Sequence, residues 1–555
     1  MPWHTHQVFN QYPDLADYDP LATDAALCEA LARAGAAWAR PALDAYAQRL
    51  GRAETYALAA QANRHGPELH RYDSRGRRID ALDFHPAWHE LMALYRAQGL
   101  VSLPFKERRA GRWAAWAAGF YLHGQVEQGT LCPATMTQAA IPLLQKEGAL
   151  WAELGARLYS DAYDARDLPA AHKASVWLGM GMTEKQGGSD VRANTTVASA
   201  LGAGGRGGEY LLRGHKWFFS APQCDAHLVT ARVGADGPFA CFYVPRWRPD
   251  GSRNAVRVQR LKDKLGNRSN ASGEVEFEDA WGVLMGEEGR GIPTIIEMAG
   301  YTRLNCVVGS AAMLRQATVQ ALAYARRRQA FGRPLADHPL MRAVLADLAL
   351  ESEAALLLLM RLAQAFERED DGAADPAERA WKRIMTPAAK FWVCKRAVEL
   401  TGEAMEVLGG NGYVEDGVLA RLYREAPVNS IWEGSGNVMC LDLLRALARE
   451  RDAAAALLAE LRAVAAGEPP LAAALEELIA WLTLPPEELE PLGRLLAQRL
   501  VLLAQACLLR RHAPAAVADA FISTRLGPIA AGRVAGAVDL RGMDVAAILG
   551  RAYPG

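Results

Sequence analysis

The chain has 555 residues, too many for a single hydrophobic core, so the sequence predicts three or four domains. Hydrophobic residues make up 51%, charged residues 23%, and the formal net charge is −1. This composition is typical of a soluble globular protein and excludes a global field that would attract nucleic acid or membrane. Eight scattered cysteines, without a CxxC pair or a Cys/His cluster, argue against a zinc site or a disulfide framework and indicate a reducing compartment.

The beginning of the chain lacks the basic and then apolar layout of a signal peptide. No uninterrupted apolar run approaches the roughly twenty residues that a membrane-spanning helix requires. We therefore expect a cytoplasmic protein. Residues 1–20 have the composition of an arm, which is either disordered or strapped to a neighbouring subunit.

Helical periodicity begins at Asp24 and continues to residue 158. A charged, turn-rich insertion at 67–85 and a small Pro-broken stretch at 131–140 interrupt it. The first 175 residues are thus predicted to be all-α, with the N-terminal helical domain spanning 1–178.

The period changes near Val176 to short apolar runs separated by Gly, Pro, Asp and Asn. The expected strands are 176–182, 195–198, 209–212, 216–220, 227–233, 239–244, 256–259 and 273–277. Such closely spaced strands are typical of a small barrel or sandwich, so we expect a β-barrel domain at 179–288.

Helical periodicity returns at Gly291. Three long helices are expected at 292–325, 339–368 and 381–408, and a helix after Gly436 would complete a four-helix bundle, the helical bundle domain at 289–448. An Ala- and Leu-rich helical domain follows at 449–555. The predicted fold class is therefore mainly α with a central β-domain.

Several short segments carry chemistry. The run from Met180 through Met182 and Thr183 to Ser189 places backbone N–H groups and hydroxyls at a strand end, as a flavin ring requires, although an ordinary strand-to-turn corner has the same pattern. This run resembles the flavin-cradling loop of acyl-CoA dehydrogenases. By the same resemblance, Phe218 would pack on the flavin and Ser220 would bond near it; the family commonly has Trp where Phe218 stands.

Two further segments resemble the family's phosphate site. Arg328 and Phe331 match an Arg-x-x-Phe-Gly segment that reaches the flavin pyrophosphate from a neighbouring subunit, and an Arg fork suits phosphate. Gly409 and Gly410 match a Gln-x-x-Gly-Gly-x-Gly segment, in which Glu406 replaces the usual Gln.

A Gly/Ser loop holds the candidate catalytic base, Glu433. Trp432 beside it could partly desolvate the carboxylate, which suits a base that takes a weakly acidic proton, although most glutamates in such loops are simply solvated. The loop resembles the family's base loop, where Glu removes the α-proton of an acyl-CoA thioester; the resemblance gives cofactor contacts to Trp432, Gly434, Ser435 and Asn437. Some relatives carry the base just before an Arg on the first bundle helix, but here Thr302 stands there.

The resemblance is closest to the AidB-like, alkylation-response branch of this family, and it extends into the C-terminal domain. It implies FAD, a homotetramer, binding of double-stranded DNA in protection or repair, and weak isovaleryl-CoA dehydrogenase activity. Clustered arginines would contact DNA phosphates: Arg494, Arg499, Arg510, Arg511, Arg525 and Arg533. The alternatives are a helical dimerisation domain with exposed arginines, and a metabolic short- or branched-chain acyl-CoA dehydrogenase without a DNA role. We expect no metal site.

Overall fold

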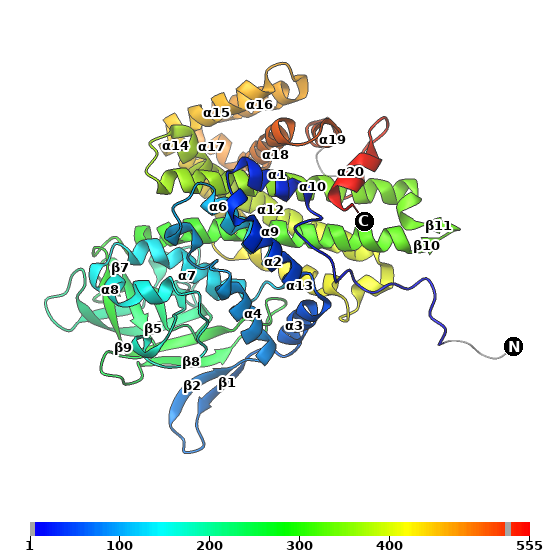
Figure 1. Ribbon diagram of the computed structural model, residues 1–555. Coiled ribbons are helices and arrows are strands. Elements are labelled where there is room, and N and C mark those ends of the chain that lie inside the picture. Colours follow the sequence, from blue (N-terminus) through cyan, green and yellow to red (C-terminus); the bar gives the residue numbers. More distant parts are fainter. Residues whose placement is uncertain (1–5, 528–533, 555) are drawn as a thin grey trace. The chain divides into compact units, whose positions relative to one another are not determined.

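The computed structural model describes residues 6–527 and 534–554. The chain forms two compact units, which we describe separately. The sheet unit comprises Glu54–Arg109 and Glu127–Asn305, and the helical unit comprises the described parts of Met1–Ala53, Ala110–Val126 and Cys306–Gly555. This architecture confirms the predicted fold class (Figure 1).

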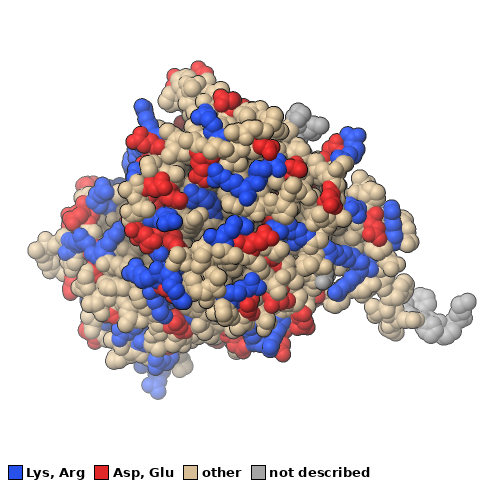
Figure 2. Space-filling model, turned by 45° about the horizontal axis from the view of Figure 1, so that its top comes forward, with Lys and Arg blue, Asp and Glu red and all other residues tan. Residues whose placement is uncertain are grey.

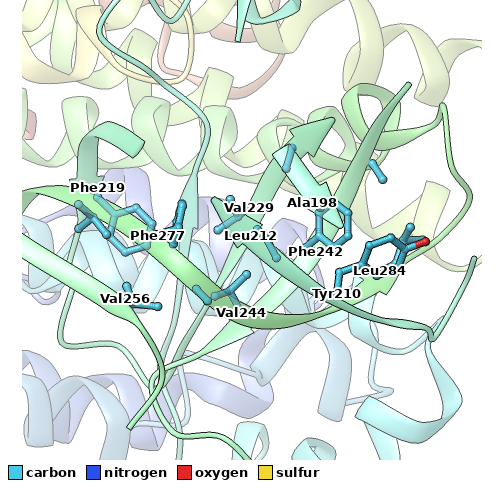
Figure 3. Close-up of a cluster of buried hydrophobic side chains, with 14 of the residues drawn as sticks. Ala198, Tyr210, Leu212, Phe219, Val229, Phe242, Val244, Val256, Phe277 and Leu284 are labelled. Carbon is cyan, nitrogen blue, oxygen red and sulfur yellow. The ribbon is translucent and has the colours of Figure 1, made fainter. Parts of the chain in front are cut away.

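The centre of the sheet unit is a seven-stranded sheet with the order β3-β6-β4-β5-β9-β7, to which β8 adds by pairing with β9. Because β7 also pairs with β6, the sheet closes on itself as a small barrel. The strands are β3 (Leu178–Gly181), β4 (Val197–Ala200), β5 (Glu209–Ser220), β6 (Ala226–Val233), β7 (Phe239–Pro245), β8 (Val256–Leu261) and β9 (Ser272–Met285). Inward side chains from six of these strands form the core, including Phe219, Val229, Phe242 and Phe277 (Figure 3).

Several helices belong mainly or wholly to the sheet unit. They are α3 (Ala53–Arg64), α4 (Pro86–Ala97), α5 (Leu103–Lys106), α7 (Leu131–Leu144) and α8 (Gly148–Leu158). The expected break at 131–140 is wrong, because Pro133 lies in the first turn of α7, where a backbone N–H is not needed.

The insertion at 67–85 is a β-hairpin, so the expectation of an all-α N-terminal region is also wrong. Strands β1 (Glu68–Tyr72) and β2 (Arg78–Asp83) pair antiparallel. The Asp73 carboxylate accepts the backbone N–H groups of Arg75 and Arg77, and Gly76 has a φ of +77°, which together close the turn. Because these strands contain many charged residues, apolar periodicity did not predict them.

The helical unit contains the bundle and the C-terminal helices. The bundle elements are α1 (Ala25–Arg33), α2 (Arg40–Leu50), α6 (Arg112–Val126), α9 (Gly291–Arg327, continuous from the sheet unit), α10 (Pro339–Asp370), α11 (Pro376–Ala380), α12 (Thr386–Val407), α13 (Val418–Ile431) and α14 (Gly436–Arg449). A π-turn at Trp381–Met385 joins α11 to α12, and α13 is a helix that the sequence analysis did not separate.

The C-terminal helices are α15 (Arg451–Ala465), α16 (Pro469–Leu482), α17 (Pro486–Leu489), α18 (Gly493–His512), α19 (Ala515–Leu526) and α20 (Val545–Ala552). Figure 1 shows α15 and α16 side by side, and α18 contacts α10, α12, α15, α16 and α19. The segment Pro486–His512 is long and apolar enough to cross a bilayer, but 72% of its most apolar window is buried inside the protein. Most of its apolar surface is therefore buried in the protein core.

The described part of the N-terminal arm packs against its own chain. The Leu15 N–H donates to the Gln320 side chain at 2.8 Å, and the Gln320 amide donates back to the Leu15 carbonyl at 2.9 Å. The Asp14 carboxylate accepts the Val418 N–H at the start of α13 at 2.7 Å. These contacts fix the arm along α9 and α13.

Candidate functional site

The two flavin-type segments of the sheet unit lie next to each other. The Thr183 carbonyl accepts the backbone N–H of Trp217 at 2.8 Å, which joins the loop after β3 to strand β5. Asn194 donates to the Met182 carbonyl at 2.7 Å and holds the other side of the loop. Met180, Met182 and Thr183 are half-buried, whereas Ser189 is exposed.

A buried ion pair supports this loop. Glu184 and Lys216 have fully buried side chains, and the Lys216 Nζ lies 2.8 Å from the Glu184 carboxylate. Glu184 also accepts the backbone N–H of Thr195 at 2.7 Å and the hydroxyl of Thr196 at 2.7 Å. Burial alone would raise the pKa of Glu184, but Lys216 and these donors hold the pKa at about 2. The flavin-type loop is thus fixed by a charged residue inside its own motif.

Strand alternation separates the two phenylalanines of β5. Phe219 is buried in the barrel core and stacks on His227, with ring centroids 3.9 Å apart. Phe218 is 52% exposed, and Ser220 has the same strand parity. The outward face of β5 therefore presents the two side chains that the sequence analysis assigned to the cofactor, with Lys262 at 4.5 Å from the Phe218 ring.

The candidate base lies in the turn between α13 and α14, in the helical unit. Glu433 is a non-glycine residue with a φ of +59°, followed by Gly434 at +102°. A left-handed conformation at a glutamate is strained by about 1 kcal/mol or more, and such strain clusters at functional sites. The turn thus orients one carboxylate by means of an unfavourable backbone geometry.

Side chains from α9, α12 and α13 hold this turn. The Lys390 Nζ donates to the Gly434 carbonyl at 2.6 Å, and the Trp432 indole donates to Asn429 at 2.9 Å. Asn429 in turn donates to the Ser310 hydroxyl at 3.0 Å. Burial raises the pKa of the Cys306 thiol well above its usual range, and the nearby Glu433 carboxylate raises it further. Glu433 itself is half-buried.

Supporting residues Glu184, Lys216 and Lys390 were not identified from the sequence. Glu184 and Lys216 stand inside the two flavin-type segments, which was their only signal; Lys390 carried none. Thr302, at the alternative base position, is buried, and its hydroxyl donates to the Ala299 carbonyl at 3.2 Å. It offers no ionisable group for proton abstraction.

The two phosphate-type segments are brought together by the N-terminal arm. The Arg328 guanidinium donates to the Asn10 carbonyl, and the Asn411 amide, next to Gly410, donates to the Gln11 side chain at 2.8 Å. Gly409 and Gly410 are exposed, and Gly409 has a φ of +61°.

Phe331 is 97% exposed at the tip of a two-residue hairpin, β10 (Gln329–Ala330) and β11 (Arg333–Pro334). Arg328, three residues before it, is half-buried and bound to the arm.

Several arginines of the predicted DNA-binding face form ion pairs with acidic side chains. Arg499 pairs with Glu477 at 2.7 Å, and Arg511 pairs with Glu460 at 3.4 Å. Arg510 pairs with both Glu468 at 3.0 Å and Asp519 at 2.8 Å. Three arginines of the predicted face are thus paired with acids of α15, of α16 and its N-cap, and of α19. Figure 2 likewise shows cationic and anionic side chains intermixed over the face drawn.

Arg525 does not belong to a surface, so its assignment to DNA is wrong. Its side chain is 2% exposed, and its guanidinium binds Asp347 and Glu351 of α10. Arg494, by contrast, is exposed and donates to Asn437 at 3.3 Å. Arg533 lies outside the described residues. Among the residues that the structure describes, no group of three or more His, Cys, Asp or Glu side chains could hold a metal ion.

Comparisons with known proteins bear on this geometry. Residues 10–165 match the family profile "Adaptive response protein AidB N-terminal domain". Residues 179–280 and 289–448 match the middle and C-terminal domains of acyl-CoA dehydrogenases. The chain is 53% identical over 452 residues to AidB of Escherichia coli (strain K12), a provisionally assigned acyl-CoA dehydrogenase, covering 81% of this chain and 82% of that protein.

Two solved structures have related folds. ACDH-11 of Caenorhabditis elegans, in complex with C11-CoA, superposes with a TM-score of 0.83 at 26% identity, covering 94% of this chain and 93% of that chain. An acyl-CoA dehydrogenase from Bacillus anthracis, complexed with FAD, superposes with a TM-score of 0.62 at 18% identity, covering 80% and 78%. The second likeness concerns the fold alone.

Proposed function

Because the chain belongs to the acyl-CoA dehydrogenase family, in its AidB branch, we propose that it oxidises the Cα–Cβ bond of an acyl-CoA thioester with Glu433 as the base. Members of this family use FAD. When bound, FAD supplies the acceptor for the β-hydrogen, which leaves the substrate as hydride. The products are an enoyl-CoA and reduced flavin.

Glu433 takes the α-proton onto its carboxylate. The Lys390 bond to the Gly434 carbonyl and the Trp432–Asn429 bond hold the strained turn, so the carboxylate needs little reorganisation when it takes the proton. By the resemblance, the residues that would hold the flavin are Met180, Met182, Thr183, Ser189, Phe218, Ser220, Trp432, Gly434, Ser435 and Asn437. The exposure of Phe218 leaves one aromatic face for a ring system.

The observation that carries this proposal is the left-handed glutamate in the turn that opens α14. The test is anaerobic titration of the purified flavoprotein with isovaleryl-CoA, butyryl-CoA and longer thioesters, following the loss of flavin absorbance. Bleaching by at least one thioester is expected. A flavin that stays oxidised with all of them, while dithionite reduces it, would remove the dehydrogenase function.

Membership of the AidB branch supports two further proposals. Isovaleryl-CoA would be a weak substrate, and double-stranded DNA would be a second ligand in the response to DNA alkylation. Support for DNA comes from the 53% identity to AidB and from the arginines of α18. Since Arg510 and Arg511 are already paired, DNA phosphates would have to displace Glu460 and Glu468 from them. The alternative is a metabolic short- or branched-chain enzyme, and a gel-shift titration against salt distinguishes the two.

We also propose a homotetramer in the cytoplasm. The exposed Phe331 and the arm-bound Arg328 support a second copy as the partner of this region, where they would reach a neighbouring flavin. Light scattering of the purified protein tests the assembly.

A further inference from the structure

The sheet unit contains a pocket of about 100 Å³ beside α4, and no residue of the flavin-type segments lines it. All of its lining residues belong to this unit. The apolar lining includes Phe84, Trp88 and Met92, and the Phe84 and Trp88 rings stack with centroids 4.0 Å apart. The loops before β3, before β6 and after β7 supply the polar lining. The pocket therefore has no part in the proposed oxidation.

Three buried donors in the pocket lining lack an acceptor. They are the indole N–H groups of Trp88 and Trp177 and the guanidinium Nε–H of Arg246, and none has a partner among the residues that the structure describes. The three side chains are 4%, 6% and 8% exposed, so bulk water does not satisfy them. Buried N–H groups without an acceptor are rare because they cost free energy. Three of them around one pocket indicate a ligand that carries acceptor atoms.

The amide of Gln223 completes the polar lining. Its oxygen is buried and has no donor among the described groups. The two ends of a side-chain amide are exchangeable by a simple rotation, which would bring its N–H groups to the same place. Gln223 is therefore compatible with a ligand that only accepts hydrogen bonds.

The ion pairs that border the pocket carry one positive charge in excess. The terminal nitrogens of Arg246 donate to the Pro222 carbonyl at 2.9 Å and to the Asp167 carboxylate at 2.8 Å. Arg253 binds the same Asp167 carboxylate at 2.7 Å, so two guanidinium groups share one negative charge. Two further pairs each combine one cation with one carboxylate: Arg166 with Asp164, and Lys173 with Asp225. This balance favours an anion over a neutral ligand.

Arg96 adds to the positive potential from behind the Trp177 ring. Its Cζ lies 4.6 Å from the centroid of that ring, and its guanidinium donates to the carbonyls of Ser160 and Val176 at 2.8 and 3.0 Å. Burial lowers the pKa of Arg96 to about 10, so the group stays charged at neutral pH. The pocket thus has cations on two sides.

The volume and the apolar lining limit the anion. A cavity that holds benzene has about 150 Å³, and this pocket offers about 100 Å³, so an aromatic acid is too large. Inorganic anions match the charge but leave Phe84 and Met92 without an apolar partner. A carboxylate on a short alkyl chain satisfies both parts of the lining.

We propose that this pocket binds the anion of a short alkyl monocarboxylic acid such as propionate. The carboxylate accepts from Trp88, Trp177 and Arg246, and the alkyl chain lies against Phe84 and Met92. The site is independent of the dehydrogenase function, because its residues contact neither the flavin-type segments nor the turn that holds Glu433.

The test is a titration of the holoprotein with acetate, propionate and butyrate, followed by saturation-transfer NMR of the ligand protons. Propionamide has the shape of propionate without its charge and should bind at least tenfold more weakly, and benzoate should not compete with propionate. Trp88→Phe and Trp177→Phe keep an aromatic ring and remove only the N–H donor. Each should weaken propionate binding roughly tenfold, as expected for loss of a hydrogen bond to a charged group.

Trp151→Phe, on α8 and outside the pocket, is the matched control and should leave the affinity for propionate unchanged. Circular dichroism checks that all three variants fold. Equal binding of propionate and propionamide, or unchanged propionate affinity in both folded pocket variants, would overturn the inference. So would the absence of binding at millimolar concentrations, which would leave only water in the pocket. The thioester titration that tests the dehydrogenase function has a separate readout, so either idea can fail alone.

Discussion

Glu184 and Lys216 form an ion pair of 2.8 Å between two side chains that are both fully buried. Lys216 also donates to the Thr230 carbonyl at 2.9 Å, and Glu184 accepts from Thr195 and Thr196, so each charged group has several partners. A buried pair is worth keeping only when such additional bonds satisfy both ions. The pair couples strand β5 to the flavin-type loop.

Breaking this pair should destabilise the protein in a pH-dependent way. Glu184→Gln leaves Lys216 buried without its counter-ion, which costs about 3–5 kcal/mol. Because the folded-state pKa of Glu184 is about 2 against an ordinary 4.5, its contribution is complete above pH 4.5 and is lost as the pH falls toward 2. Urea unfolding at pH 7, 5 and 3 measures the difference between variant and unaltered protein.

That difference should shrink from pH 5 to pH 3. The matched control is Glu276→Gln, an exposed carboxylate on β9, which should show no comparable difference at any pH. A constant difference for Glu184→Gln down to pH 3 would show that its carboxylate does not carry the effect.

Glu433→Gln should keep the flavin and lose its reduction by substrate. The amide occupies the same turn but cannot accept a proton, so the rate of bleaching by a thioester should fall about 10²–10⁴-fold. Stopped-flow absorbance measures the rate, and the ratio of flavin to protein absorbance checks that FAD stays bound. Glu415→Gln, an exposed glutamate before α13, is the control. Normal reduction in Glu433→Gln would assign the base to another residue.

Arg525→Ala should destabilise the helical unit strongly. It removes the guanidinium that binds both Asp347 and Glu351 in the buried core, at a cost of about 3–5 kcal/mol. Chemical denaturation monitored by circular dichroism measures the loss. Arg541, whose side chain is 91% exposed, pairs with Asp539, and Arg541→Ala should be without measurable effect. Equal stability of the two variants would contradict the structural role of Arg525.

DNA binding should depend on the arginines of α18 and also on the acidic residues that pair with them. Arg510→Ala with Arg511→Ala should reduce the slope of log affinity against log salt by about two, since each phosphate contact contributes about 0.9. Glu468→Gln, which releases Arg510 from one of its two acids, should strengthen binding. Gel shifts at several salt concentrations measure both effects. If the slope stays the same in the double variant, the DNA site lies elsewhere.

The sequence by itself determined the order of helices, barrel and helices, because apolar period and turn residues are local properties. The motifs in it assigned Phe218 and Ser220 to the cofactor and set Glu433 in a loop before a helix. The hairpin at 67–85 was not predicted, because its strands contain charged residues and lack a clear apolar alternation.

Only the tertiary structure decided which charged side chains are buried and paired and which are exposed. Arg525 is 174 residues from Glu351 in sequence, and Arg510 is 42 residues from Glu468, so no local pattern distinguishes a buried, paired arginine from the exposed Arg494. Desolvation and Coulomb attraction depend on neighbours in space, and folding brings these neighbours together from distant helices. The chemistry of a charged residue in this protein is therefore set by what packs against it.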